Sequence, residues 1–269
     1  MLAIVGVGLI GGSFALAARA AGLFDRIVGV DTNPVHLAAA QKAGIIDQGA
    51  AAVPEAAEAV LLAVPSDRVT GLLEELADHP GLVFDVASVK APICAAPGPR
   101  PTRFVPAHPI AGAERRGPDA ARSGLFADHL VVLTPTAATP EADVERLTGW
   151  WEALGARVQR MDAAAHDELF ALTSHLPHLA AFAYMQLIKA EHLPFAAGGF
   201  RDFSSIAAAD PDMWVPILRS NQTAILAVLD GLESAFAEFR AAIAAPQPAA
   251  LRKLLESARD RRLEYPVRS

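Results

Sequence analysis

The sequence predicts an α/β fold, in which an N-terminal doubly wound sheet is followed by an all-α domain. Three observations predict it. A glycine-rich loop lies between a short apolar strand pattern and a helical pattern near the N-terminus. Apolar strand patterns then alternate with helical patterns as far as Met161, and only helical patterns follow. We therefore predict two domains, residues 1–161 and residues 162–269.

The first strand pattern runs into a loop with the spacing Gly-x-Gly-x-x-Gly. Gly6 permits a tight turn, Gly8 lets a pyrophosphate approach the backbone, and Gly11 lets the following helix pack against the strand. The first N–H groups of that helix are unpaired and favour a phosphate. The whole unit predicts a Rossmann-type dinucleotide site.

An acidic residue, Asp31, ends the second strand pattern, 20 residues after Gly11. A carboxylate at this place accepts hydrogen bonds from the adenosine ribose and repels a 2′-phosphate, so NAD is predicted rather than NADP. We expect eight residues to contact the cofactor: Gly6, Gly8, Leu9, Ile10, Gly11, Asp31, Val64 and Ser66.

The later elements follow the same pattern up to Met161. Strands are predicted at residues 59–64, 82–86, 104–105, 130–133 and 156–161. Beyond them we predict one long helix over 162–191, interrupted or bent near Pro177, then a helix over 213–244 and an amphipathic helix over 249–265. Helices this apolar exceed what a single layer hides, so we predict a homodimer.

Composition narrows the class of protein. The chain has 269 residues, a net charge of −7 and a single cysteine, Cys94. The negative charge argues against a nucleic-acid partner, and one cysteine excludes a disulfide framework. No uncharged apolar run is long enough to span a membrane, and no secretory leader is evident. We expect a cytoplasmic enzyme that binds a small molecule.

Candidate catalytic residues follow the strands. His108 comes directly after a strand, and Pro109 favours an extended backbone for it. Ser88 ends the preceding strand, and the helical part supplies His178 and Arg201. A dehydrogenase needs a base at the alcohol, donors that orient it and a cation for a substrate carboxylate. These residues provide all three.

Each candidate also has a purely structural interpretation. Ser88 is suited to cap a helix, and Arg201 to pair with Asp202. His175 packs equally well in a core. His175 and His178 have the spacing of a metal pair, but no further ligand cluster accompanies them, so no metal site is predicted.

Together these motifs resemble the prephenate/arogenate dehydrogenase family of tyrosine biosynthesis. The resemblance spans both domains and rests on GVGLIGGS at 6–13, DVASVK at 85–90, HPIAGAE at 108–114, TSHLPH at 173–178, GFRD at 199–202 and DPDMW at 210–214. It implies an NAD-dependent oxidative decarboxylation of prephenate to 4-hydroxyphenylpyruvate.

The resemblance also implies roles for individual residues. His108 is the base that takes the hydroxyl proton, and Ser88 hydrogen-bonds the same hydroxyl or holds His108 and the nicotinamide in register. His178 contacts the substrate side chain. Glu114 lies near the mouth of the pocket, where it gates access or opposes anions.

One position departs from the family pattern. Ser205 stands where an arginine is expected to bind a substrate carboxylate. Arg201 is our preferred substitute, because it lies four residues earlier on the same helical pattern. The other cations are Arg115, Arg116 and Arg219. If none of these arginines binds the substrate carboxylate, prephenate binds more weakly, or the substrate is a different cyclohexadienyl compound.

Three other functions compete with a prephenate dehydrogenase. An arogenate or dual-specificity enzyme differs only in the substrate side chain. A β-hydroxyacid-type dehydrogenase normally has a catalytic lysine in the helical domain, and Lys189 is a poor candidate for it. An NAD-binding sensor binds the cofactor without turnover, and the Ser88–His108 pair argues against it.

Overall fold

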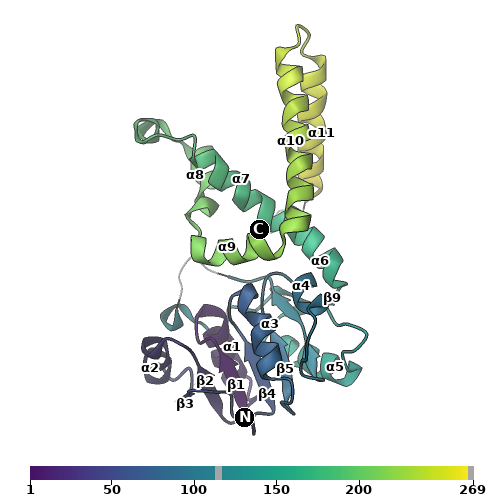
Figure 1. Cartoon of the computed structure of the whole chain (residues 1–269). Coiled ribbons are helices and arrows are strands. Elements are labelled where there is room, and N and C mark those ends of the chain that lie inside the picture. Colours follow the sequence, from purple (N-terminus) through teal and green to yellow (C-terminus); the bar gives the residue numbers. More distant parts are fainter. Residues whose placement is uncertain (113–116, 266–269) are drawn as a thin grey trace. The chain divides into compact units, whose positions relative to one another are not determined.

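A computed structural model describes residues 1–112 and 117–265 of the chain. It divides into two compact units, residues 1–222 and 223–269, each of which is described by itself. The first unit holds both β-sheets and the helices up to α9 (Figure 1). The predicted domain boundary near Met161 stays a prediction.

A six-stranded parallel sheet forms the centre of the first unit. Its strand order is β3-β2-β1-β4-β5-β6, and every neighbouring pair is parallel. The strands are β1 (Leu2–Val5), β2 (Ile27–Val30), β3 (Gln48–Ala50), β4 (Ala59–Leu62), β5 (Leu82–Asp85) and β6 (Phe104–Val105). This order confirms the predicted Rossmann-type sheet, in which ligands bind beyond the carboxyl ends of the strands where the order reverses.

Helices cover both faces of this sheet. They are α1 (Leu9–Ala20), α2 (Pro34–Lys42), α3 (Ser66–Glu75), α4 (Ala91–Ala95) and α5 (Glu141–Ala153). Successive side chains of a strand point to opposite faces, so the apolar strands supply two cores. In β1, Leu2 and Ile4 pack with Phe14 of α1, whereas Ala3 and Val5 pack in the other cluster with Val69 of α3.

The structure adds a second sheet that the sequence analysis did not predict. Strands β7 (Ala107–Pro109), β8 (Leu130–Leu133) and β9 (Arg157–Arg160) form it, with β7 antiparallel to β8 and β8 parallel to β9. Pro106, which has no N–H to donate, separates β6 from β7. The chain therefore changes sheets one residue before the strand that carries His108.

The helical part is more interrupted than its sequence pattern predicts. The interruption expected near Pro177 is confirmed, because α6 (Ala163–Phe170) passes through a π-helical turn (Ala171–His175) into α7 (Leu176–Met185). The predicted extent to residue 191 is wrong, since α7 ends at Met185. Pro177 lies in the first turn of α7, where it costs no hydrogen bond. Short 3₁₀ turns (Ala190–Phe195 and Ser205–Ala208) flank α8 (Gly198–Ser204).

The helix predicted over 213–244 is also wrong as a single element. It is divided at Asn221 into α9 (Pro211–Ser220) and α10 (Gln222–Ala244). The Asn221 side chain turns back into the first unit, where its Nδ2 donates to Asp167 O at 2.8 Å. The amphipathic helix predicted at the end is confirmed as α11 (Ala249–Glu264), which forms a hairpin with α10 in the second unit (Figure 1). Among residues 1–112 and 117–265, no helix has the length and apolar character that crossing a bilayer requires.

Candidate active site

The glycine-rich loop between β1 and α1 has the shape that its sequence predicts. Gly6 has a φ of +93°, and a side chain there would collide with the carbonyl of Ala63. A side chain on Gly11 would collide with the carbonyl of Gly6. Among the described residues other than the chain neighbours of Gly8, no atom lies within 4 Å of the position that a Gly8 side chain would take, and none of their side chains caps α1. The loop thus leaves open backbone at a helix N-terminus, which suits a pyrophosphate.

Asp31 lies beside this loop at the end of β2. Its Oδ2 accepts from Val7 N at 3.0 Å, and its Oδ1 accepts from Asn33 N at 2.8 Å. His36 Nδ1 lies 3.8 Å from Oδ2. These bonds hold the carboxylate next to the glycine loop, so the residues present fit the adenosine end of a dinucleotide.

A cavity of about 980 Å³ extends from this loop to the helices that follow the second sheet. Its wall includes seven of the predicted site residues: Gly8, Leu9, Ile10, Ser88, His108, His178 and Ser205. Gly6, Gly11, Asp31, Val64, Ser66 and Arg201 are not part of this wall. Glu114, Arg115 and Arg116 lie outside the described residues, between Gly112 and Gly117 of the wall.

His108 is joined to a buried histidine and a buried aspartate. His108 Nδ1 lies 2.8 Å from His166 Nε2, and His166 Nδ1 lies 2.7 Å from Asp167 Oδ1. A carboxylate only accepts, so His166 Nδ1 donates to it and His166 Nε2 must accept. His108 Nδ1 therefore carries the proton of that imidazole. This leaves His108 Nε2 with a free lone pair, which is what a general base requires.

The Asp167 carboxylate is fixed from a second side. Its Oδ1 accepts from Lys90 N at 2.8 Å and its Oδ2 accepts from Ala91 N at 2.7 Å. His166 is fully buried and Asp167 is 4% exposed. Both are held by the start of α6, where Asp162 caps the helix through Ala164 N and Ala165 N. The hydrogen bonds from Asp167 to His166 and from His166 to His108 are therefore held in one arrangement.

The surroundings of His108 keep its imidazole neutral. Burial lowers the pKa of His108 well below its usual value, and electrostatic repulsion between an imidazolium at His108 and the neighbouring groups His166, Lys90 and His175 lowers it further. Phe170 packs edge-on at 5.0 Å between ring centroids. His108 is thus able to accept a proton at any pH near neutrality.

A second histidine, His178 of α7, also lines the cavity. His178 stacks on Trp214, with ring centroids 3.9 Å apart and an interplanar angle of 27°. Its Nδ1 donates to Ser174 O at 2.9 Å, which fixes the ring and leaves Nε2 for a ligand. Ser205 donates to Asp202 O at 3.0 Å from the same side of the site.

Comparison with known proteins places this geometry in a family. The model of the nucleotide-binding domain of prephenate dehydrogenase matches residues 14–160, and the model of its dimerization domain matches residues 162–257. The chain belongs to the prephenate dehydrogenase family. The resemblance inferred from the motifs is therefore confirmed.

Individual members of the family are similar over most of their length. The cyclohexadienyl dehydrogenase of Zymomonas mobilis is 36% identical, over 90% of this chain and 88% of that protein. The prephenate dehydrogenase of Bacillus subtilis is 35% identical, over 98% of this chain and 76% of that protein. A crystal structure of prephenate dehydrogenase from A. aeolicus with hydroxyphenyl propionate and NAD+ superimposes with a TM-score of 0.87 at 30% identity, covering 98% of this chain and 96% of that one.

The departure at Ser205 has a visible consequence for this member of the prephenate dehydrogenase family. Among the described residues that line the cavity there is no lysine or arginine. Arg201 is exposed on α8. A carboxylate-binding cation at this site must therefore reach in from outside the described wall.

The sequence analysis missed His166 and Asp167. The only signal available was that His166 lies four residues before Phe170, so a polar side chain occupies an apolar helical face. His175 was left open between core and ligand. The structure buries it, with Asn221 Nδ2 3.1 Å from its Nδ1. Within residues 1–112 and 117–265, no group of three or more His, Cys, Asp or Glu side chains is arranged to hold a metal ion.

We expect the buried His175 to make the protein sensitive to acid. Burial lowers its pKa from 6.5 to about 4, so the unfolded chain binds this proton first as the pH falls. The contribution of the neutral His175 to the free energy of unfolding is complete above the pKa that this residue has in the unfolded chain. It is lost as the pH falls through the pKa of the folded state, and the loss is about 3 kcal/mol for a shift of this size. Urea unfolding of wild type and His175→Asn from pH 7 to pH 4 measures it. His175→Asn should lose less stability than wild type over this pH range. The control His192→Asn, at an exposed histidine, should follow wild type. Equal plots of unfolding free energy against pH for all three proteins contradict the prediction.

Proposed function

We propose that this protein is an NAD-dependent prephenate dehydrogenase, which converts prephenate to 4-hydroxyphenylpyruvate and CO2 in tyrosine biosynthesis. The observation that carries the proposal is the His108 imidazole. It faces a cavity beside an open dinucleotide loop, and its lone pair is directed by His166 and Asp167. Membership of the prephenate dehydrogenase family supports the reaction.

The proposed mechanism uses few side chains. When NAD is bound, it supplies the acceptor for the hydride that leaves the hydroxyl-bearing ring carbon. Ser88 hydrogen-bonds the hydroxyl, and His108 Nε2 accepts its proton as the carbonyl forms. His108 returns that proton to the same oxygen when the ring becomes aromatic with loss of CO2. The backbone of Gly8, Leu9 and Ile10 holds the pyrophosphate, and Asp31 holds the adenosine ribose.

The direct test follows NADH formation with prephenate and with arogenate, each with NAD and NADP. We expect turnover of prephenate with NAD, and far weaker turnover with NADP because Asp31 repels a 2′-phosphate. The absence of turnover with both substrates would remove the proposal. The alternative is an arogenate or dual-specificity enzyme. It is favoured by the similarity to a cyclohexadienyl dehydrogenase.

We propose that Arg201 binds the substrate carboxylate and that His178 and Ser205 also contact the substrate; Glu114, which lies outside the described residues, stays a predicted site residue. We expect Arg201→Ala to raise the KM for prephenate about tenfold or more, which is the worth of a charge-assisted hydrogen bond. The value of kcat should change little. Steady-state kinetics at saturating NAD measures both constants. Arg219→Ala is the matched control, and a rise in KM for that variant alone identifies Arg219 as the partner.

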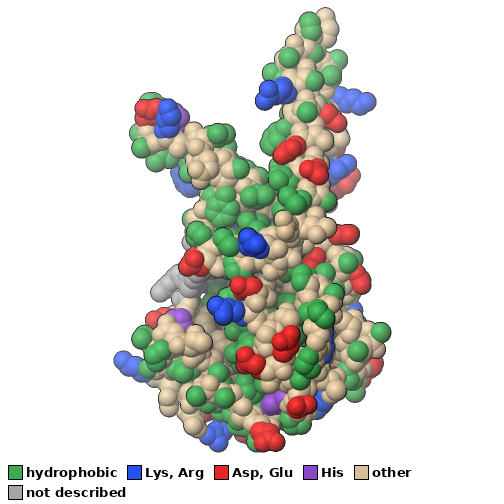
Figure 2. All heavy atoms as spheres, in the orientation of Figure 1, with side chains coloured by type: hydrophobic (Ala, Val, Ile, Leu, Met, Phe, Trp, Pro, Cys, Tyr) green, Lys and Arg blue, Asp and Glu red, His purple; other side chains and the backbone are tan. Residues whose placement is uncertain are grey.

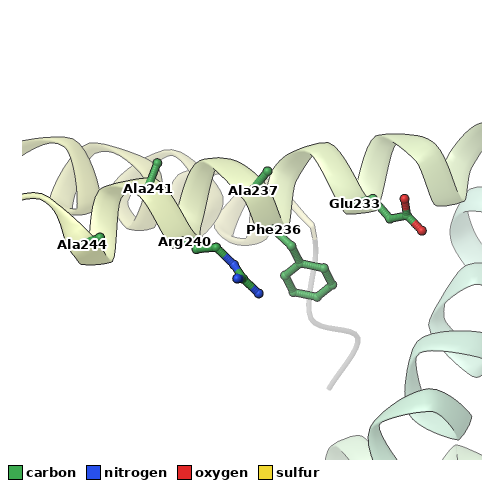
Figure 3. Close-up of a pocket in the computed structure, with 6 residues that line it drawn as sticks. All are labelled: Glu233, Phe236, Ala237, Arg240, Ala241 and Ala244. Carbon is green, nitrogen blue, oxygen red and sulfur yellow. The ribbon is translucent and has the colours of Figure 1, made fainter.

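We propose that the protein is a homodimer, for which the match to a dimerization domain is the main support. Side chains of the α10–α11 hairpin leave apolar surface exposed (Figure 2). A groove of about 470 Å³ on α10 is lined by Glu233, Phe236, Ala237, Arg240, Ala241 and Ala244. Phe236 is 64% exposed and projects beside Arg240 (Figure 3). Small side chains next to a projecting ring suit close packing by a helix of a second copy.

We expect sedimentation at micromolar concentration to show a dimer. Phe236→Asp should dissociate it, because a charge replaces an apolar contact. Val35→Asp is the control, since Val35 is also exposed, at 69%, but lies on α2. A monomeric wild type, or equal dissociation by both substitutions, contradicts this arrangement. Cytoplasmic localisation stays a prediction.

A further inference from the structure

A lysine and an aspartate form an ion pair in the interior of the first unit. Lys90 and Asp85 are both fully buried, and Lys90 Nζ donates to Asp85 Oδ2. Nζ also donates to Ala107 O at 2.7 Å. Buried charges are costly unless they are paired and hydrogen-bonded, and replacing such a pair with apolar residues often does not destabilise a protein. Stability alone therefore does not account for this pair.

The pair holds the backbone of the residue that precedes each of the two proposed catalytic residues in the sequence. Ala107 precedes His108, and its N–H donates to Asp85 Oδ1 at 3.2 Å while its carbonyl accepts from Lys90. Ala87 precedes Ser88, and its N–H donates to Asp85 Oδ2 at 3.0 Å. One ion pair thus fixes the residues that carry Ser88 and His108.

The backbone of Lys90 extends the connection to the buried histidine. Lys90 N donates to Asp167 Oδ1 at 2.8 Å, and the same oxygen accepts from His166 Nδ1. Lys90 therefore contacts all three parts of the site: the end of β5, the strand of His108 and the start of α6.

We propose that the buried Asp85–Lys90 pair is a positioning element of the active site, which holds Ser88, His108 and the His166–Asp167 arm in register and places an ammonium group near the His108 imidazole. The kinetic part of this inference rests on the proposed function. Its structural part does not.

The electrostatic part follows from the groups that face His108. They are His166 from α6, His175 from the π-helical turn, and Lys90, which immediately precedes α4. Asp85, at the end of β5, pairs with Lys90. Lys90 is among the charges that lower the pKa of His108. Removing its ammonium leaves the Asp85 carboxylate unpaired, and both changes stabilise an imidazolium. The pKa of His108 should therefore rise in a Lys90 variant.

The test uses the full chain and four variants. Lys90→Met removes the ammonium, Lys90→Arg retains the charge, and the double variant Asp85→Asn/Lys90→Met removes both charges. Arg103→Met is the matched control: it breaks the ion pair of Arg103 with Asp143, which is 3% exposed, at the amino end of β6. We would measure melting temperature, kcat and both KM values against pH, and the titration of His108 by NMR in the free protein.

We expect Lys90→Met to lower kcat about 10²-fold through misplacement of the base, with much smaller changes in KM. The pKa of His108 should rise in this variant and stay low in Lys90→Arg. The double variant should recover melting temperature without recovering kcat, and it carries the test if Lys90→Met does not fold. Arg103→Met should lose melting temperature alone.

Two results would overturn the proposal. In the first, Lys90→Met and the double variant fold and keep both the wild-type kcat and the His108 titration. In the second, Arg103→Met loses kcat as much as Lys90→Met does at an equal loss of melting temperature. A wild type that turns over neither prephenate nor arogenate overturns the proposed function instead, and the NMR titration then decides the positioning of His108 by itself.

Discussion

His108→Asn should lower kcat for prephenate by roughly 10²–10⁴-fold, which is the usual worth of a general base. The asparagine amide is able to replace the bond from His108 Nδ1 to His166 Nε2, so the buried line is retained. It has no lone pair of suitable basicity at the position of His108 Nε2. The KM for prephenate should change little, because the substrate side chain and its carboxylates are bound elsewhere in the cavity.

The pH dependence gives a second readout for His108. Because the pKa of His108 lies well below its usual value, wild-type kcat/KM should stay high below pH 6.5 and fall only in stronger acid. The residual activity of His108→Asn should lack that acid limb. His129→Asn is the control, since His129 lies on the same cavity but its Nδ1 bonds Ala127 O and has no bond to His166. A loss below tenfold in His108→Asn would show that this residue is not the base.

Asp167→Asn should lower kcat by a similar factor, about 10²-fold or more, without any contact to substrate. An asparagine has one acceptor oxygen for the three donors His166 Nδ1, Lys90 N and Ala91 N. In the orientation in which its amide nitrogen faces His166, the amide donates to Nδ1 and forces the proton of His166 onto Nε2. His108 Nδ1 must then accept, and the proton of His108 moves to Nε2, where the base needs its lone pair. The comparison case for this effect is the loss of about 10⁴ in kcat when the aspartate of a serine-protease triad becomes asparagine.

Glu168→Gln provides the matched control for Asp167→Asn. It makes the same chemical change at the next residue, which is exposed. We expect wild-type kcat in the control, and in Asp167→Asn a changed His108 tautomer in ¹⁵N NMR spectra of the histidine rings. If Asp167→Asn keeps the wild-type tautomer and still loses kcat, the effect comes from its bonds to Lys90 N and Ala91 N instead.

Local spacing in the sequence was enough to predict the glycine loop, Asp31 and the end of the strand before His108. These features depend on turns and on the alternation of strands and helices, which neighbouring residues determine. Local spacing was not enough to predict the second sheet or the division between α9 and α10 at Asn221. Strand pairing and a side chain that turns back across the fold depend on residues more than 20 positions apart.

The buried polar residues were missed for a related reason. Lys90, Asp85, His166 and Asp167 are types that usually lie at the surface. Only their mutual bonds make them interior residues, and these bonds link positions 85, 90, 107 and 167. His108 itself was identified because a histidine that follows an apolar strand pattern is conspicuous in the sequence, although the structure places it within β7 and not in a loop. The tautomer of His108 was not predicted, since it depends on His166, which lies 58 residues away in the sequence.

Asn221 closes the chain of bonds that begins at His108. Its amide donates to Asp167 O, and its position is the last but one in the first compact unit. Among the described residues, every bonded group from His108 through His166 and Asp167 to Asn221 therefore precedes the α10–α11 hairpin. Substitutions in the hairpin that test the proposed dimer therefore replace none of these bonded residues, so assembly and catalysis are examined in separate variants.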